Sequence, residues 1–227
     1  MYKILYMTQP QPEKPIYWIG SSLDDLKEFP ADVKKHFGFE LHAIQHGTEP
    51  AQWKPIPNWG TGVIELKYKD SSGAYRVVYV AKFRHAIYIL HSFQKKHKKQ
   101  PNQMLRLSKH VIKKLRYWRN NMSKIDTQIR HITQPTDNIF ADLGLEDAGN
   151  LKKEADALAN AKLALTRVVA DWVQENHFKQ EEAAEILGVS RPRLSDAINA
   201  KISKFTLDAL VTMVSKTGHS ITISITN

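Results

Sequence analysis

The feature that most constrains the fold is a pair of short apolar runs in the first half of the chain, separated by a polar break. Residues 77–80 and 87–90 consist of valine, isoleucine, leucine and tyrosine, which favour β-strands. The break between them contains Lys82, Arg84 and His85, so the pattern predicts a hairpin. Basic residues follow the second run: Lys95, Lys96, His97, Lys98 and Lys99. Such close positive charges repel one another unless they are solvated or face a polyanion, so they predict either a phosphate-binding platform or a solubilised strand end.

Charge is distributed unevenly along the chain. Residues 1–121 contain 21 Lys and Arg against 9 Asp and Glu, a net charge of +12, whereas residues 122–227 contain 12 against 14, a net charge of −2. A length of 227 residues fits one large domain or two small ones. The asymmetry favours two modules with different partners, of which the basic one is a candidate for binding nucleic acid.

The composition argues against several classes of protein. No cysteine is present, which excludes disulfides and thiolate zinc sites and fits a reducing compartment. No apolar run reaches about 18 residues, so we expect no transmembrane helix, and residues 1–15 lack the pattern of a signal peptide. We therefore expect a cytoplasmic protein. The histidines are scattered, with no pair at ligand spacing that also has a carboxylate on the same face, so we expect no metal and no other cofactor.

The first half combines strand and helix patterns. Residues 16–19 and 63–68 have strand patterns, with two helices expected between them. In the second of these helices, apolar residues recur at spacings of four, four and three: Val33, Phe37, Leu41 and Ile44. Residues 50–62, rich in proline and glycine, are expected to be loop, and residues 101–118 a third helix. The order β-α-α-β-β-β-α predicts a small antiparallel sheet with helices on one side.

Three motifs within these elements carry a resemblance to a known family: Gly62–Leu66, Tyr75–Tyr79 and Leu90–Lys96. Together with the order of elements, they make residues 15–118 similar to the phage-derived Gp49-like toxins of the HigB/RelE superfamily. The resemblance implies an endoribonuclease that cuts mRNA, usually on the ribosome, by attack of the RNA's own 2′-hydroxyl on the neighbouring phosphate. Such a reaction needs no metal, but it needs cations to offset charge on the phosphate and groups that move two protons.

Candidate residues for this reaction cluster in and around the predicted hairpin. Arg76 matches the family's phosphate-contacting arginine, and its guanidinium fork can hold two phosphate oxygens. The other candidate catalytic residues are Lys95, Lys96, Glu65, Lys67, His91 and His97. Further candidate RNA contacts are Lys69, Lys98 and Lys99.

The roles of the acid and the base stay open. Glu65 or a lysine of lowered pKa could be the base, and His91 or His97 the acid. The alternatives are that Glu65 forms a salt bridge with Arg76 or Lys67, and that His91 packs on the sheet.

Residues 117–123 look like the end of one protein and the start of another, as in a fused two-gene operon. We expect a toxin domain at residues 1–121, a linker or toxin-docking segment at residues 122–150, and a second domain at residues 151–227. Within the linker, four acidic residues are candidates for contact with the basic half: Asp137, Asp142, Glu146 and Asp147. The alternative is that they are solvated.

The second half begins with a long amphipathic helix at residues 151–176, followed by a helix-turn-helix pattern. A short helix is expected at Gln180–Leu187, a sharp turn at Gly188, and a recognition helix at Ser190–Asn199. Residues 138–226 resemble the Xre/HigA antitoxin family, which implies operator binding as a dimer and neutralisation of the toxin. Candidate DNA contacts are Gln180, Ser190, Arg191, Arg193, Ser195, Asn199, Lys201 and Lys204. The alternative is a helix-turn-helix used only for packing.

The C-terminal residues alternate between isoleucine and small polar side chains: Ile221, Thr222, Ile223, Ser224, Ile225 and Thr226. This pattern predicts a half-buried strand, which would pair with a second copy or cap the edge of its own domain.

The fold class expected is therefore α+β, a RelE-like sheet with helices followed by an all-α helix-turn-helix domain with a short dimerisation strand. The expected partners are mRNA or the ribosome, operator DNA, the other half of the same or another chain, and a second copy. The expected function is a type II toxin–antitoxin system in one chain, with the nuclease inhibited by its tethered antitoxin. The alternative is a DNA-binding regulator whose basic half is a non-catalytic module.

Overall fold

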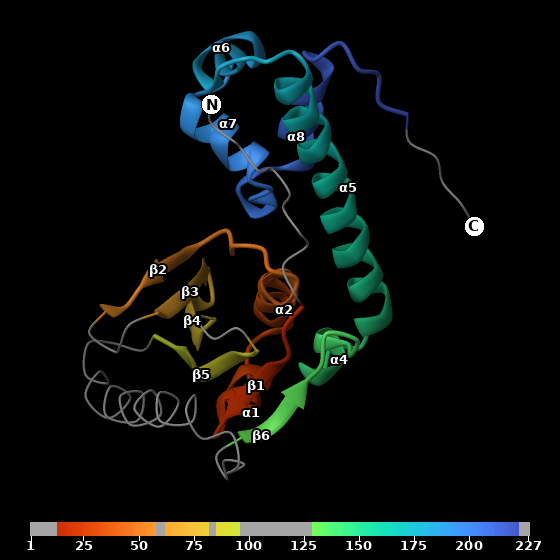
Figure 1. The fold of residues 1–227 in the computed structure, drawn as a ribbon. Helices are drawn as coiled ribbons and strands as arrows, with labels where there is room; N and C mark the ends of the chain where they lie inside the picture. Colours follow the sequence, from red (N-terminus) through yellow and green to blue (C-terminus); the bar gives the residue numbers. More distant parts are fainter. Residues whose placement is uncertain (1–12, 58–61, 82–84, 96–128, 223–227) are drawn as a thin grey trace. The chain divides into compact units, whose positions relative to one another are not determined.

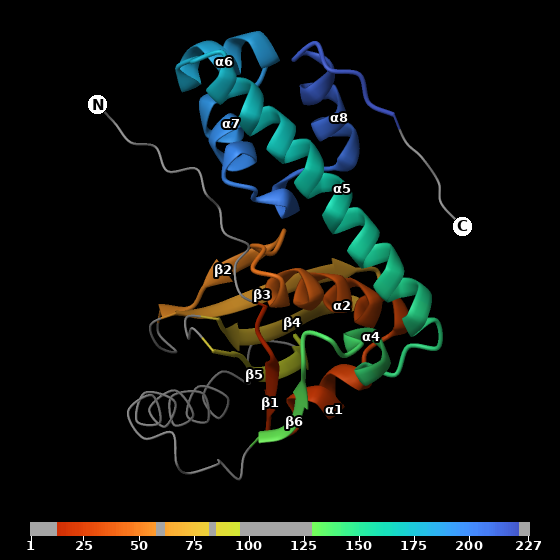
Figure 2. The same cartoon turned by 45° about the vertical axis from the view of Figure 1, so that its right-hand side comes forward.

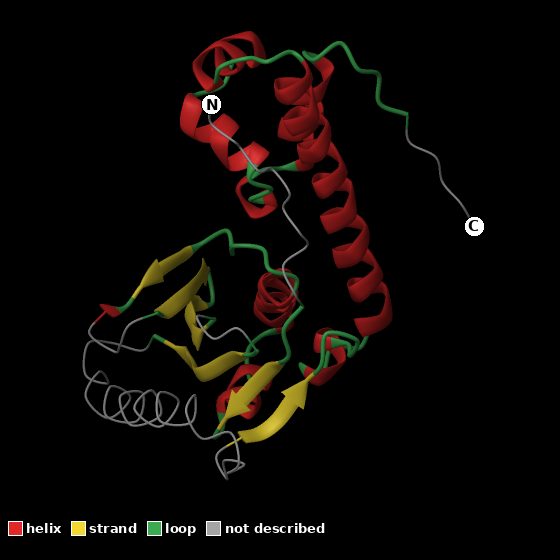
Figure 3. Ribbon diagram, in the orientation of Figure 1, coloured by secondary structure: helices red, strands yellow, loops and turns green. Residues whose placement is uncertain are grey.

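The computed structural model describes residues 13–57, 62–81, 85–95 and 129–222 (Figure 1). The chain divides into two compact units, the first ending at Lys152 and the second beginning at Lys153. The first unit has a β-sheet with helices, and the described part of the second is helical, so the fold class is α+β as expected (Figure 3). The predicted helix at residues 101–118 lies outside the described residues.

Within the described residues, six strands of the first unit form one sheet: β1 (Ile16–Ile19), β2 (Trp53–Pro55), β3 (Val63–Asp70), β4 (Gly73–Val80), β5 (Ile87–Gln94) and β6 (Ile129–Thr133). Their order across the sheet is β2-β3-β4-β5-β1-β6. Neighbouring strands are antiparallel except β1 and β5, which run parallel. The sheet is therefore mixed and not purely antiparallel. Local alternation did not reveal this, because β1 pairs with strands that are distant in the sequence. Strand β2 also lies within the stretch expected to be loop.

Helices α1 (Ser22–Lys27) and α2 (Ala31–Gln45) cover one face of this sheet (Figure 2). The ring of Phe29 lies 5.0 Å from that of Tyr75, and the ring of Phe37 lies 6.4 Å from that of Tyr68. The predicted apolar face of α2 is confirmed, because its residues are at most 5% exposed: Val33, Phe37, Leu41 and Ile44. Burial contributes about 1.5–3 kcal/mol for each large apolar side chain, which holds α2 on the sheet.

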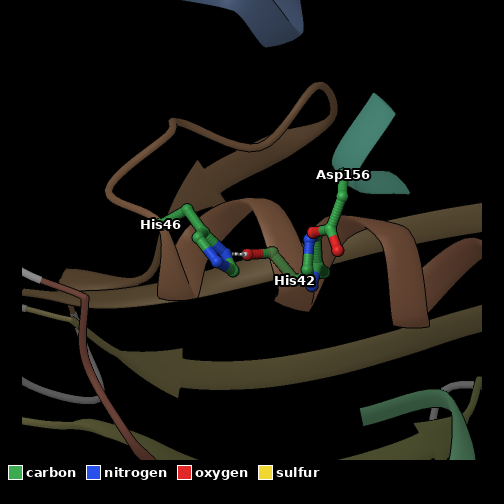
Figure 4. A group of neighbouring side chains, drawn as sticks. All are labelled: His42, His46 and Asp156. Carbon is green, nitrogen blue, oxygen red and sulfur yellow. Dashed lines mark hydrogen bonds between the residues drawn. The ribbon is translucent and has the colours of Figure 1, made fainter. Parts of the chain in front are cut away.

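Two histidines lie one turn apart at the end of α2 (Figure 4). The ring centroids of His42 and His46 are 4.3 Å apart, and Nδ1 of His46 lies 2.8 Å from the backbone oxygen of His42. Nε2 of His46 lies 3.4 Å from the carboxylate of Glu13. The carbonyl of His42 also accepts the backbone N–H of His46 at 3.3 Å, so His46 caps the end of α2 through both its main chain and its side chain. The pair is not among the candidates identified from the sequence.

Residues 129–152 belong to the first unit, which places its end beyond the expected boundary at residue 121. Strand β6 pairs antiparallel with β1, and the short helix α4 (Ile139–Asp142) packs near α2. Ile139, Phe140 and Leu143 are at most 1% exposed. The stretch expected to be a linker is therefore folded in its described part. Strand pairing satisfies its backbone hydrogen-bonding groups, and burial removes its apolar side chains from water.

The described part of the second unit contains most of the long helix α5 and three further α-helices: α5 (Ala148–Glu175), α6 (Gln180–Leu187), α7 (Arg191–Ile198) and α8 (Leu207–Ser215). A 3₁₀ turn, η2 (Ile202–Lys204), lies before α8. The core is formed by side chains that are at most 1% exposed: Val169, Leu187, Leu194, Leu210 and Val214. Among the described residues, no helix has the length and apolar character needed to cross a membrane.

Helices α6 and α7 form the predicted helix-turn-helix. Gly188 ends α6 with φ +64°, a left-handed conformation that glycine adopts at little cost. Ser190 caps α7, because its Oγ accepts a hydrogen bond from the backbone N–H of Arg193 at 3.4 Å. The predicted bounds of both helices are confirmed within one residue. Of the predicted C-terminal strand, Ile221 and Thr222 are described and are not in a strand, and residues 223–227 lie outside the described residues.

Candidate nucleic-acid interfaces

Candidate residues of the first unit lie on one face of β3, β4 and β5. We call it the hairpin face and define it by Glu65, Lys67, Lys69, Arg76, His91 and Lys95. Lys67 lies opposite Arg76, which lies opposite Phe93. Two residues further along β4, Glu65 lies opposite Val78, which lies opposite His91. Because directly opposed residues point to the same side of a sheet, these pairings gather the candidates on one surface.

A β-bulge in β5 is what places His91 and Lys95 on this face. Val80 pairs with Tyr88, whereas Val78 pairs with His91, so the register shifts by one residue at Leu90. Uninterrupted alternation from Tyr88 would put residues 91 and 95 on the opposite side. The extra residue changes the phase of the strand and turns its last part towards Arg76.

Arg76 is held in place by three contacts. Its Nε lies 3.7 Å from Oε1 of Glu65, and its side chain is 14% exposed. Its Nη1 donates to the backbone oxygens of Tyr75 at 2.7 Å and Tyr68 at 3.4 Å. Among the described residues, Nη2 donates no hydrogen bond. The guanidinium is therefore fixed, with donor capacity left for an anionic ligand.

Glu65 lies between two cations. Its Oε1 faces Arg76, and its Oε2 lies 3.3 Å from Nζ of Lys54 on β2. Oε2 is closed to solvent and, despite the approach of Lys54, accepts no hydrogen bond of good geometry. A substrate hydroxyl could reach this oxygen only after rearrangement. The arrangement therefore favours an orienting role for Glu65, and its partners are Arg76 and Lys54, not Lys67.

Three lysines of the hairpin face form no ion pair with any described residue: Lys67, Lys69 and Lys95. Lys69 lies opposite Ala74, whose carbonyl accepts a hydrogen bond from the backbone N–H of Lys95 at 2.7 Å. Lys69 and Lys95 thus flank β4 at the same level, next to Arg76. Positive charge gathered in this way attracts phosphate. The remaining candidates lie outside the described residues and stay predictions: Lys96, His97, Lys98 and Lys99.

His91 is partly buried on the hairpin face. Burial lowers the pKa of its imidazole below the usual 6.5, although the carboxylate of Asp25 acts in the opposite direction. The imidazole is therefore mostly neutral at pH 7. This state suits a proton acceptor better than the proton donor considered from the sequence.

Sequence reasoning missed an aromatic group on the same side of the sheet. Oη of Tyr88 lies 3.0 Å from Nε2 of His85, and the ring of Tyr88 meets that of Tyr17 edge to face at 5.3 Å. Burial, aided by Tyr17, raises the pKa of Tyr88 to about 12, so its hydroxyl keeps its proton at neutral pH. Tyr88 also belongs to an apolar cluster with Val80 and Leu90, which indicates a structural role. The alternation of β5 was the only sequence signal for this group.

In the second unit, the first turn of α7 presents two exposed arginines. The guanidinium carbon of Arg193 lies 4.8 Å from the ring centroid of Phe205, a cation–π contact that orients it. Nε of Arg191 lies 3.2 Å from Oε1 of Glu181, and both side chains are more than 60% exposed. Because exposed ion pairs contribute only about 0–1 kcal/mol, Arg191 can exchange Glu181 for a DNA phosphate or base at little cost.

Four polar candidates lie in or next to α6 and α7: Gln180, Ser190, Ser195 and Asn199. Gln180 is the first residue of α6, where backbone N–H groups lack partners within the helix. The hydroxyl of Ser190 is engaged as the cap of α7. Nδ2 of Asn199 donates to the backbone oxygen of Ser195 at 2.7 Å.

Lys201 and Lys204 both contact Asp196, at 3.1 and 3.0 Å. Burial alone would raise the pKa of Asp196, but hydrogen bonds from Lys204 and Lys201 outweigh it and lower that pKa. The structure therefore brings these candidate phosphate contacts together around an acid. Their charge is partly compensated before any DNA is bound.

Two known families match parts of the chain. Residues 24–113 match the family described as phage-derived protein Gp49-like, and residues 139–226 match a family described as helix-turn-helix domain. Searches of the curated proteins and of the solved structures found no match.

Proposed function

We propose that this chain is a toxin and its antitoxin in one polypeptide, because residues 24–113 match the Gp49-like family and residues 139–226 match a helix-turn-helix family. The first unit cleaves mRNA, on the ribosome and without a metal. The second binds operator DNA as a homodimer, represses its own operon and neutralises the first. Both act in the cytoplasm, where their substrates are found.

The observation that carries the first half of the proposal is the hairpin face. Arg76 and three lysines that form no ion pair with any described residue gather on adjacent strands beside His91. Opposed residues on neighbouring strands have Cβ atoms about 4.5–5.5 Å apart, so one phosphate can reach several of these cations. This arrangement supports phosphate binding by Arg76, Lys67 and Lys69.

The proposed reaction is an internal phosphoryl transfer. The 2′-oxygen bonds to phosphorus while the bond from phosphorus to the 5′-oxygen breaks, leaving a 2′,3′-cyclic phosphate and a 5′-hydroxyl. The neutral imidazole of His91 takes the 2′-hydroxyl proton, and a protonated lysine of the hairpin face or water returns a proton to the 5′-oxygen. Arg76 offsets the charge that develops on the phosphate, and Glu65 keeps its guanidinium oriented.

The helix-turn-helix family match and the exposed arginines of α7 support the DNA-binding half of the proposal. Arg191 and Arg193 reach base edges in the major groove, while Lys201 and Lys204 contact phosphate after exchange from Asp196. Covalent tethering keeps the inhibitor at a high effective concentration, so the intact chain is silent as a nuclease.

The test is cell-free translation with residues 1–152 added alone. These residues include β6 and α4, which pack in the first unit. We expect the fragment to stop translation and to leave 2′,3′-cyclic phosphate ends on the message, and the full chain to do neither. Arg76→Ala should slow cleavage by about 10²–10³-fold, the cost of removing one transition-state hydrogen-bond donor. Arg130→Ala, at an exposed position of β6, is the matched control. A fragment that melts cooperatively yet leaves the message intact would reject the nuclease.

One observation favours a second function, in which the basic unit binds nucleic acid without cutting it. Glu65 and two backbone carbonyls already engage Arg76, which lowers its capacity for a phosphate. In that case residues 1–152 bind RNA or DNA in a salt-dependent manner, and cleavage products are absent at every pH.

A further inference from the structure

Residues 129–143, which we call the docking segment, lie in the region where the boundary given by the family match differs from the boundary given by packing. The helix-turn-helix family match begins at residue 139, but the compact first unit extends to Lys152. Helix α4 therefore belongs by sequence to the helix-turn-helix family and by packing to the first unit. We propose that the docking segment is the element by which the antitoxin half holds the toxin half. This inference rests on the proposed function only for the names of the two halves.

The first part of the docking segment adds a strand to the edge of the sheet. In β6, Thr133 pairs with Ile16 and His131 pairs with Trp18 of β1. Pairing of this kind gives backbone hydrogen bonds, and side chains supply selectivity. Nε1 of Trp18 donates to Oγ1 of Thr133 at 2.9 Å, and both residues are fully buried. Nε2 of Gln45 donates to the backbone oxygen of Thr133 at 3.3 Å. The indole of Trp18 and the side-chain amide of Gln45, both in the first half, therefore bind the same residue of the docking segment, Thr133.

The second part of the docking segment inserts an aromatic ring beside α2. Phe140 is fully buried, and its ring meets that of Phe39 edge to face at 5.1 Å. At Gly38, a Cβ atom would lie only 2.7 Å from Cε1 of Phe140. The missing side chain thus makes the space that the ring occupies. Asn138 caps α4 and fixes the ring's approach, because its Oδ1 accepts from the backbone N–H of Phe140 at 3.0 Å.

Among the described residues, the two acids of this segment contact groups of the segment itself. Asp142 accepts a hydrogen bond from Thr133 at 2.5 Å and lies 2.9 Å from Nε2 of His131, so it joins the two parts of the segment to each other. Asp137 accepts from the backbone N–H of Gln134, within its own turn. Strand pairing and apolar burial therefore carry the attachment seen in the described residues, and contact of the acids at residues 146 and 147 with the basic half stays a prediction.

The docking segment is also separate from the hairpin face. Strand β6 lies at the edge of the sheet, with β1 and β5 between it and β4. Helix α4 packs near α2, which covers the face of the sheet opposite the hairpin face. The segment thus anchors the antitoxin half without covering Arg76, and the inhibition itself falls to residues beyond it.

The experiment uses the full chain with a specific protease site inserted between Met122 and Ser123. After cleavage, the affinity between the two pieces is measured by dilution and size-exclusion chromatography, without RNA. We expect the pieces to remain associated at about micromolar concentration. Phe140→Ala should raise the dissociation constant by at least about a hundredfold, since a buried aromatic ring is lost. Ile132→Ala, which truncates a side chain that is 38% exposed in the same segment, should change it by less than about threefold.

Gly38→Ala provides the second variant, because it changes the surface of α2 that Phe140 contacts and leaves the docking segment itself intact. We expect it to weaken association when Phe140 is present and to have little further effect in Phe140→Ala chains, because the clash then disappears. Raising the salt from 0.1 to about 1 M should leave the affinity nearly unchanged, as apolar contacts are not screened. Three results would overturn the proposal: separation of the wild-type pieces on cleavage, equal effects of Phe140→Ala and Ile132→Ala, or additive effects of Gly38→Ala and Phe140→Ala. None of them depends on whether the first unit cuts RNA.

Discussion

Arg76 and Glu65 face each other on adjacent strands, with Nε and Oε1 3.7 Å apart and both side chains at most 14% exposed. A carboxylate so placed fixes the plane of the guanidinium. It also neutralises part of the positive charge that would otherwise attract a phosphate. The pair therefore sets how Arg76 is presented to a ligand, and substitutions at residue 65 distinguish orientation from proton transfer.

If Glu65 orients Arg76, Glu65→Gln should retain RNA cleavage within about tenfold, because an amide oxygen still accepts from the guanidinium, whereas Glu65→Ala should lose more. The rate and its pH profile are measured with residues 1–152, and the melting temperature controls for folding. A loss of about a hundredfold or more in Glu65→Gln, together with a vanished pH dependence, would instead assign Glu65 as the base.

Cleavage should depend on pH through His91. Its pKa is lowered by burial, so the imidazole is neutral at pH 7 and becomes protonated only as the pH falls below the usual 6.5. As a base it works only when neutral, so the rate should be level near pH 7 and fall on acidification. His91→Gln should lower the rate by about 10²–10⁴-fold and remove this acid limb. A rate that falls as the pH rises through the same range would make His91 the acid.

The acid limb needs a control for folding. The unfolded chain binds more protons than the folded one between the lowered pKa of His91 and 6.5, so stability also decreases as the pH falls through that range. Circular dichroism at each pH separates loss of structure from loss of catalysis.

The two kinds of DNA contact proposed for the second unit should respond differently to salt. Arg193→Ala should cost about 1–3 kcal/mol for the preferred sequence and reduce discrimination among sequences, because a base contact is lost. Lys204→Ala should weaken all sequences alike and reduce the salt slope by about one. Binding is measured against DNA selected by the full chain from a random pool. Arg167→Ala, at an exposed position of α5, is the matched control. Equal salt slopes and equal specificity in all three variants would contradict the assignment.

The turn of the helix-turn-helix should not tolerate a side chain at Gly188. Its φ of +64° costs a non-glycine residue about 1–2 kcal/mol, and an added Cβ would lie 2.5 Å from Nζ of Lys216, which donates to the backbone oxygen of Leu187. We expect Gly188→Ala to lower the free energy of unfolding by at least about 1 kcal/mol in urea denaturation. Gly149→Ala, in a helix with nothing within 4 Å of the added carbon, should be neutral or stabilising. Equal stability of the two variants would show that the turn relaxes freely.

The helix-turn-helix is the part of this protein that its sequence predicts most closely. Its signals are local: the spacing of Ala183, Ala184 and Leu187, the glycine at residue 188 and the cap at Ser190 all act within one or two helical turns. Helix α2 follows the same rule, since the four-four-three spacing of its apolar residues places them on one buried side. The hairpin strands were also identified from residue types alone.

The arrangement of the sheet and of the hairpin face depended on tertiary structure. The parallel pairing of β1 with β5, and the addition of β6, join segments far apart in the sequence. The bulge at Leu90 decides on which side His91 and Lys95 lie, although every residue type in β5 would suit either phase. The sequence by itself therefore determined the local elements and the types of residue available for chemistry. Only the tertiary structure decided which strands are neighbours and in what register, because register is fixed by burial and pairing against distant partners that local periodicity does not specify.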